Sequence, residues 1–102
     1  MRQDATGDDK LHLIRMLESI QRIGSYTWSG AQDAVIWNLE VIGEAAKRLS
    51  AGQARIPREM LVRFREYLIE RYAELDPNEV WQFLERELQP LKLSVEESLA
   101  AA

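Results

Sequence analysis

Four successive stretches of the chain carry apolar side chains at every third or fourth position, and this spacing constrains the fold most. An α-helix turns once in about 3.6 residues, so each set of apolar side chains falls on one face of a helix. The sets run from Leu13 to Ile23, from Val35 to Leu49, from Leu61 to Leu75 and from Trp81 to Leu99. No stretch of useful length alternates apolar and polar residues, as a half-buried strand would. The short polar connections predict an all-α, up-and-down antiparallel bundle of four main helices.

Helix-capping residues indicate where each helix begins. The expected starts are at Asp8 or Asp9, at Ser29 with Gln32 three residues on, at Pro57 after Ile56, and at Asp76 with Pro77 and Glu79. Polar side chains at such positions accept hydrogen bonds from free backbone N–H groups, and proline fits the first turn because it needs no such bond. Pro90 lies within the last helix, which it is expected to kink or break.

Length and composition indicate one small domain with a core of its own. The chain has 102 residues, 46% of them hydrophobic, and we expect a single domain over residues 1–102. Its ordered core should span about 9–95, because the composition is too apolar for disorder over most of the chain. The net charge of −4 argues against a strongly basic nucleic-acid footprint. No apolar run approaches the roughly 20 residues that span a bilayer, so a cytoplasmic protein without membrane contact is expected.

Two kinds of site are disfavoured by residue counts. The chain has no cysteine, which excludes disulfides, thiol catalysis and cysteine-ligated zinc. His12 is the single histidine, which disfavours a metal cluster or a Ser-His-Asp arrangement. No metal and no cofactor are therefore expected.

Arginines are concentrated on the third helix and just before it. They are Arg55, Arg58, Arg63, Arg65 and Arg71. Guanidinium groups bind phosphate in a bidentate manner, so such a cluster has the chemistry to hold RNA or a nucleotide. Glu59, Glu66 and Glu70 are interleaved with them, however, and i,i+4 pairs of opposite charge are typical of a solvated helix face. The charge pattern alone favours the solvated face.

Tryptophans and one glycine point to packing. Trp28, Trp37 and Trp81 are expected to be core or interface residues rather than platforms for base stacking. Gly43 lies in the middle of the second helix, where glycine costs about 1 kcal/mol relative to alanine. Close approach of a neighbouring helix is the simplest reason for a glycine there.

One long stretch carries a family resemblance. The segment "QDAVIWNLEVIGEAAKRLS", residues 32–50, resembles the second helix of the HepT-like family of HEPN-domain proteins. The similarity continues through "IPREMLVRFREYLIERY" and "DPNEVW" and ends near residue 93. The resemblance implies an all-helical bundle that dimerises about a twofold axis. It also implies a metal-independent ribonuclease toxin, whose partner is a small nucleotidyltransferase antitoxin, MntA.

The active motif of that family is present only in part. It is an arginine, often followed by asparagine, with a histidine five residues after the arginine and a tyrosine two further on. Aligned without a gap from Ile56-Pro57, Arg65 takes the arginine position and Tyr72 the tyrosine position. Glu66 stands where asparagine is usual, and Glu70 stands where the histidine should be. Trp37 replaces an arginine that many relatives carry.

The resemblance assigns roles to these positions. Arg65, Glu70 and Tyr72 are the candidate catalytic residues by resemblance. The arginine cluster, not the motif, makes Arg63, Arg65 and Arg71 the candidate RNA- or phosphate-binding residues. In the family, the nucleotidyltransferase neutralises the toxin by transferring AMP to the motif tyrosine. Tyr72 is therefore the candidate AMP acceptor, although a tyrosine packed at the end of the helix is an equal alternative.

The substitution of the histidine bears on activity. Cleavage requires a group that activates the ribose 2′-hydroxyl and a group that protonates the leaving oxygen, and histidine suits both at neutral pH. Glutamate can accept a proton, but an exposed carboxylate cannot donate one at pH 7 and repels phosphate. We therefore expect weak cleavage or none. Positions 65 and 70 are about 140° apart around a helix, so a homodimer is expected to bring the groups together, with the cleft partly closed by Arg–Glu pairs.

Two other interpretations remain open. The chain has the features of a non-catalytic module that binds a nucleotidyltransferase or a nucleotide. It also has those of a redesigned or stabilised scaffold, because glutamate in place of asparagine and histidine raises helix propensity.

Overall fold

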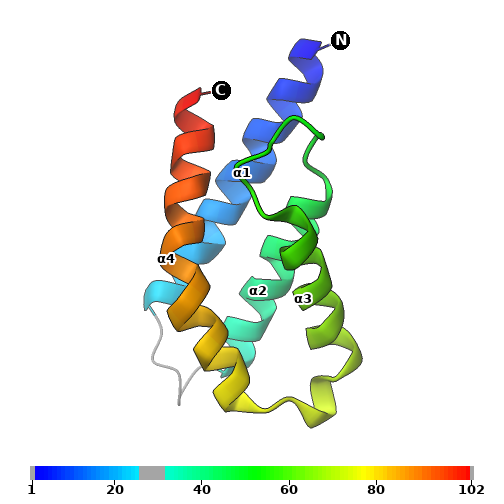
Figure 1. Cartoon of the computed structure of the whole chain (residues 1–102), viewed down its shortest axis with the longest axis vertical. Helices are drawn as coiled ribbons and strands as arrows, with labels where there is room; N and C mark the ends of the chain where they lie inside the picture. The colour runs from blue at the N-terminus through cyan, green and yellow to red at the C-terminus, as the bar shows by residue number, and fades with distance from the viewer. Residues whose placement is uncertain (1, 26–31, 102) are drawn as a thin grey trace.

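The computed structural model describes residues 2–25 and 32–101, and the side chains of residues 8–25 and 32–101. The elements are α1 (Arg2–Ser25), α2 (Gln32–Lys47), α3 (Arg58–Glu70), the short 3-10 helix η2 (Tyr72–Glu74) and α4 (Pro77–Ala101). Successive helices run in opposite directions, with α2 between α1 and α3 and with α4 along α1 (Figure 1). The expected all-α bundle of four main helices is confirmed, and the described residues contain no strand. No helix in this part of the chain is long and apolar enough to cross a membrane.

The core is built from the apolar faces that the periodicity predicts. The predicted residues that are buried are Leu13, Met16, Ile20, Ile23, Val35, Leu39, Ile42, Ala46, Leu49, Leu61, Leu68, Leu84, Leu91 and Val95. On α4 the prediction is wrong for Trp81, whose side chain is 40% exposed, while Val80 and Phe83 are buried. Successive residues are about 100° apart around a helix, so Trp81 lies next to the buried face and not on it. Leu75 follows η2 and is only half-buried, because α3 already ends at Glu70.

The start of α1 differs from the expectation. The helix begins at Arg2, so neither Asp8 nor Asp9 caps it. The Asp9 side chain is only 4% exposed, and its carboxylate accepts hydrogen bonds from the loop that follows α2. Asp9 therefore joins α1 to the loop after α2 and does not cap its own helix.

The other helix starts agree more closely with their signals. Asp76 caps α4: its carboxylate accepts a hydrogen bond of 2.9 Å from the backbone N–H of Asn78, and Pro77 is the first helical residue. Pro57 directly precedes α3, one position earlier than a first-turn proline. The expected cap at Ser29 lies outside the described residues, as does Trp28.

Pro90 bends α4 but does not break it. The helix continues from Pro77 to Ala101 with Pro90 inside it, and its ribbon changes direction near the middle (Figure 1). Pro90 is exposed, so its ring lies toward solvent. Of the two expected outcomes, a kink or a break, the helix shows the kink, which is what a proline inside a helix is expected to cause.

Candidate functional site

The close contact between α2 and α3 at Gly43 positions the candidate site. A Cβ atom added at Gly43 would lie 2.6 Å from the Cβ of Arg65 and 2.9 Å from the carbonyl oxygen of Leu61. Only a residue without a side chain lets the two helices approach this closely. The expected close approach of a neighbouring helix is therefore confirmed, and that helix is the one that carries the motif.

Arg65 extends over α2 toward Glu44. Its guanidinium Nη2 lies 3.4 Å from Oε1 of Glu44, and the Arg65 side chain is 27% exposed. The Nε atom of Arg65 is buried and makes no hydrogen bond within the described part of the chain. Arginine has five N–H donors, so this single long ion pair leaves most of them available.

Glu44 holds a second guanidinium group with its other carboxylate oxygen. Nε of Arg48 donates a hydrogen bond of 2.9 Å to Oε2 of Glu44, and Nη2 of Arg48 lies 2.8 Å from the same oxygen. The hydrogen bond from Arg48 is the main reason that the pKa of Glu44 lies below its usual value. Burial of the carboxylate opposes this effect, and the positive charges of Arg48 and Arg65 add to it. Glu44 is thus a shared anchor for two arginines.

Tyr72 also faces α2, about two turns beyond Arg65. The Tyr72 hydroxyl donates a hydrogen bond of 2.9 Å to Oδ1 of Asp33, at the start of α2. This bond and the negative charge of Asp33 raise the pKa of Tyr72, with smaller contributions from burial and from Glu40. The Tyr72 side chain is 56% exposed, so its hydroxyl is reachable from solvent.

The glutamates that replace motif residues lie on another side of α3. Glu66 and Glu70 are both exposed, and they lie about 100° and 140° around the helix axis from Arg65. The structure therefore brings Arg65 and Tyr72 onto the α2 side and leaves Glu70 apart from them.

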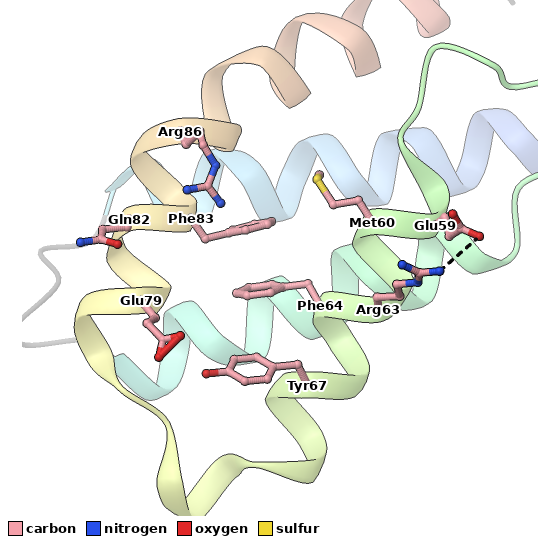
Figure 2. A pocket seen from close by; sticks show the side chains of 9 residues that line it. All are labelled: Glu59, Met60, Arg63, Phe64, Tyr67, Glu79, Gln82, Phe83 and Arg86. Carbon is pink, nitrogen blue, oxygen red and sulfur yellow. Dashed lines mark ion pairs between the residues drawn. The ribbon is translucent and has the colours of Figure 1, made fainter.

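The arginines of the expected phosphate-binding set do not converge either. Arg63 lines a groove of about 600 Å³ between α3 and α4 and pairs with Glu59 at 3.8 Å (Figure 2). In the same groove the rings of Phe64 and Phe83 stack with their centroids 3.8 Å apart. Arg71 follows α3 and pairs with Glu74 at 3.9 Å.

Arg58, the first residue of α3, has a structural role at the start of that helix. Its Nη2 donates hydrogen bonds to the backbone carbonyl oxygens of Leu49 and Ser50, the second at 2.5 Å. This guanidinium therefore ties the loop after α2 to the start of α3. Arg55 is exposed in the same loop.

Arg65 lines a hollow of about 430 Å³ whose walls include residues of α1, α2 and α3. Its lining includes three arginines that charge clustering along the sequence does not single out, namely Arg15, Arg22 and Arg48. The spacing of Arg15 and Arg22, two helical turns apart, is the one signal that places them on a common face. Trp37 also lines the hollow and is 65% exposed, so of the two expected positions, core or interface, the core is wrong for it and the interface stays a prediction.

Groups that bind metal are not gathered at this site. Within the described residues, no three side chains of histidine, cysteine, aspartate or glutamate are arranged so that they could hold a metal ion. The chemistry available in the hollow is that of guanidinium groups, carboxylates and one indole.

Comparison with known proteins gives a family. A family model described as ribonuclease HepT-like matches residues 11–98 of the chain. The protein "Gamma-glutamylcyclotransferase and putative RNase MJ0434" of Methanocaldococcus jannaschii is 32% identical over 99 residues, with 83% of this chain and 45% of that protein covered. The chain thus spans less than half the length of this relative. No solved structure matches the chain. Because the family model covers most of the sequence, the chain belongs to the HepT-like ribonuclease family.

Proposed function

We propose that this chain is a HepT-like protein of toxin–antitoxin type whose ribonuclease activity is weak or absent. The proposal rests on the placement of the motif residues, which do not all face the same side of the molecule. Arg65 and Tyr72 face α2, where Glu44 and Asp33 hold them, while Glu70 is exposed on another side. The family match and the relative described as an RNase support a ribonuclease ancestry.

The chemistry of the three groups explains why activity should be low. The guanidinium of Arg65 can stabilise the negative charge that develops on a phosphorane-like transition state. Glu70 replaces the histidine whose imidazole is suited both to accept and to donate a proton near neutral pH. General acid–base catalysis contributes about 10²- to 10⁴-fold, so the loss of one proton-transfer group removes much of that factor.

A homodimer through the exposed side of α3 accounts for the geometry of the motif. Two copies of α3 about a twofold axis would bring position 70 of one protomer toward Arg65 of its partner. Ile69, which is 47% exposed on this helix, supplies apolar surface for such a contact. Arg63 and Arg71 make only long, exposed ion pairs at 3.8 and 3.9 Å within the chain. Such pairs are weak, so these arginines are free to pair with the partner's glutamates and partly close the cleft.

Tyr72 is the residue that an MntA-type nucleotidyltransferase would modify. Its side chain is 56% exposed, and its hydroxyl donates a hydrogen bond to the carboxylate of Asp33. Attack of the phenol oxygen on the α-phosphorus of ATP would release pyrophosphate, and Asp33 is placed to take the phenol proton. A covalently attached AMP would stand beside Arg65 and block the approach of RNA.

A non-catalytic binding module is the second candidate function. The ion pair between Arg65 and Glu44 favours it, because a guanidinium held by a carboxylate binds ligands without needing position 70. Such a module should bind a nucleotidyltransferase or a nucleotide, and its RNA chemistry should not respond to changes at Arg65.

Restoring the missing motif residues tests the proposal. RNA cleavage should be compared between the natural chain and the variant with Glu66→Asn and Glu70→His. Activity that appears or rises strongly in the variant supports a competent fold with a degraded site. Equal activity in the two proteins would contradict the role given to position 70.

A further inference from the structure

The hollow over α1, α2 and α3 concentrates positive charge in an acidic protein. Its lining residues are Arg15, Glu18, Arg22, Trp37, Glu40, Val41, Glu44, Ala45, Arg48 and Arg65. Four arginines, from α1, from α3 and from the turn just after α2, thus face three glutamates, so the hollow has a small positive excess, whereas the whole chain has a net charge of −4. A local excess of this kind attracts an anion that the surface as a whole repels.

Two of the four arginines have no carboxylate partner. Arg48 and Arg65 share Glu44, but neither Arg15 nor Arg22 makes an ion pair with any residue that the structure describes. Both are exposed on α1, and their separation of seven residues places them on one face. Their guanidinium groups are therefore free to bind phosphate.

The hydrogen bonds of Asp9 fix how these arginines align with α2. Asp9 on α1 accepts hydrogen bonds from the backbone N–H and the hydroxyl of Ser50, just beyond α2. The two helices are antiparallel, so each step forward on α1 corresponds to one step back on α2 (Figure 1). Arg15 therefore comes level with Glu44, and Arg22 comes level with Trp37.

This alignment gives the hollow two different ends. At the level of Glu44 the lining includes Arg15, Arg48 and Arg65, and at the level of Trp37, whose indole is exposed, it includes Arg22. Seven residues of α2 separate the ends, which is about 10 Å along a helix. One end is suited to phosphate, and the other combines a flat aromatic surface with a cation.

We propose that the hollow binds single-stranded RNA, with a base stacked on Trp37 and backbone phosphates on Arg15 and Arg22. This inference rests on the proposed function, because it gives the class of ligand that the motif arginine would meet. An aromatic platform beside a positively charged groove is the arrangement that binds single strands without reading their sequence. An acidic peptide would use the arginines but would have no planar base for the indole.

The proposed dimer contact borders this surface at Arg65. It uses Ile69, Glu66 and Glu70, about 40–140° around α3 from Arg65, whereas Arg15, Arg22 and Trp37 lie on α1 and α2. RNA in the hollow would therefore run beside the dimer contact and past the motif residues.

Binding of a short, unstructured, fluorescein-labelled oligouridylate, followed by fluorescence anisotropy, tests the inference. Trp37→Ala should weaken binding about 5- to 150-fold, which is the measured range for loss of one stacked base, and Trp37→Phe should retain most of it. The double variant Arg15→Gln, Arg22→Gln should also bind more weakly. Over about 50–200 mM salt, its slope of log K against log salt should be shallower by about 1.4, since each phosphate contact in a single strand contributes about 0.7.

The matched control is the double variant Arg55→Gln, Arg86→Gln. It removes the same charge from exposed arginines outside the hollow, so it should bind RNA nearly as the natural chain does. Circular dichroism melts verify that all variants are folded. The inference is overturned if the control loses as much affinity as the α1 variant, if Trp37→Ala binds normally, or if the natural chain shows no saturable binding up to about 100 µM.

Cleavage by the Glu66→Asn, Glu70→His protein, measured in parallel, separates this inference from the proposed function. If that protein cleaves RNA while the hollow variants bind RNA normally, the inferred RNA-binding role of the hollow is wrong and the proposed function stands. If binding depends on the hollow but the restored protein never cleaves, the role given to position 70 is contradicted instead.

Discussion

Two carboxylates of α2 hold the two ends of the motif in place. Glu44 pairs with Arg65 at 3.4 Å, and Asp33 accepts a hydrogen bond from Tyr72 at 2.9 Å. Both motif side chains therefore have an orientation that is set before any ligand arrives. No comparable contact fixes Glu70 among the described residues, and it remains an exposed side chain of α3.

The titration of Tyr72 reports directly on its contact with Asp33. A neighbouring carboxylate disfavours the phenolate, so the pKa of Tyr72 is raised, and Asp33→Asn should lower it toward the ordinary value. Ultraviolet difference titration of each protein against its Tyr72→Phe counterpart isolates this phenol from the other tyrosines. An unchanged Tyr72 titration in Asp33→Asn would show that the hydrogen bond does not persist in solution.

Periodicity predicts the faces of the helices better than it predicts individual positions. On α2 the predicted residues Val35, Leu39, Ile42 and Ala46 are all buried, although Trp37, which is also apolar, is 65% exposed on the same helix. On α4, Trp81 has the apolar character of a core residue but lies next to the buried face, whereas Val80 and Phe83 fill it. Residue type alone does not distinguish positions that are one residue apart when both are apolar.

Gly43 controls the separation of α2 and α3. We expect Gly43→Ala to destabilise the protein by about 1–2 kcal/mol, because overpacking against Leu61 and Arg65 exceeds the roughly 1 kcal/mol gain in helix propensity. Gly24→Ala is the matched control, since nothing lies within 4 Å of a Cβ atom there. It should be neutral or stabilise by up to about 1 kcal/mol in urea unfolding. A stabilising Gly43→Ala would contradict the close contact.

Asp9 joins α1 to the loop after α2 and should make stability depend on pH. Burial alone would raise the pKa of Asp9, but hydrogen bonds from Ser50 and Gln53 outweigh it and the pKa is lowered. A lowered pKa stabilises the fold above the ordinary value and ceases to do so as the pH falls through the folded value. Stability should therefore decline below about pH 4.

The variant Asp9→Asn isolates that contribution. It should cost about 1–3 kcal/mol at neutral pH, because a buried network loses its charged acceptor. Its unfolding free energy, measured in urea from pH 7 downward, should fall less steeply with acid than that of the natural chain. Parallel curves for the two proteins would show that other groups account for the acid sensitivity.

At the scale of the whole molecule, the connections between helices decide which charges meet. The sequence indicates Arg65 and Tyr72 as motif positions, but their partners Glu44 and Asp33 are 21 and 39 residues away in the chain. Local spacing indicates which face a residue occupies, not how far one helix is shifted along another. For the same reason the hollow could not be predicted, because its lining residues come from three helices.

The proposed dimer is a prediction at this same scale. Light scattering at micromolar concentration should give twice the mass of one chain. Ile69→Asp should shift the protein toward the monomer, because it places a charge in the apolar part of the contact. Leu93→Asp, at a similarly exposed position on α4, should leave the dimer intact. A monomeric natural chain, or equal effects of the two variants, would contradict an interface on α3.

The rate of RNA cleavage after restoration of the motif tests the central claim most directly. Single-turnover rates should be measured for the natural chain, for Glu66→Asn with Glu70→His, and for the latter with Arg65→Ala added. The account predicts that the restored protein cleaves about 10²- to 10⁴-fold faster than the natural chain and that the loss of Arg65 abolishes the gain. Cleavage by the natural chain at the restored rate, or a restored rate that does not depend on Arg65, would contradict it.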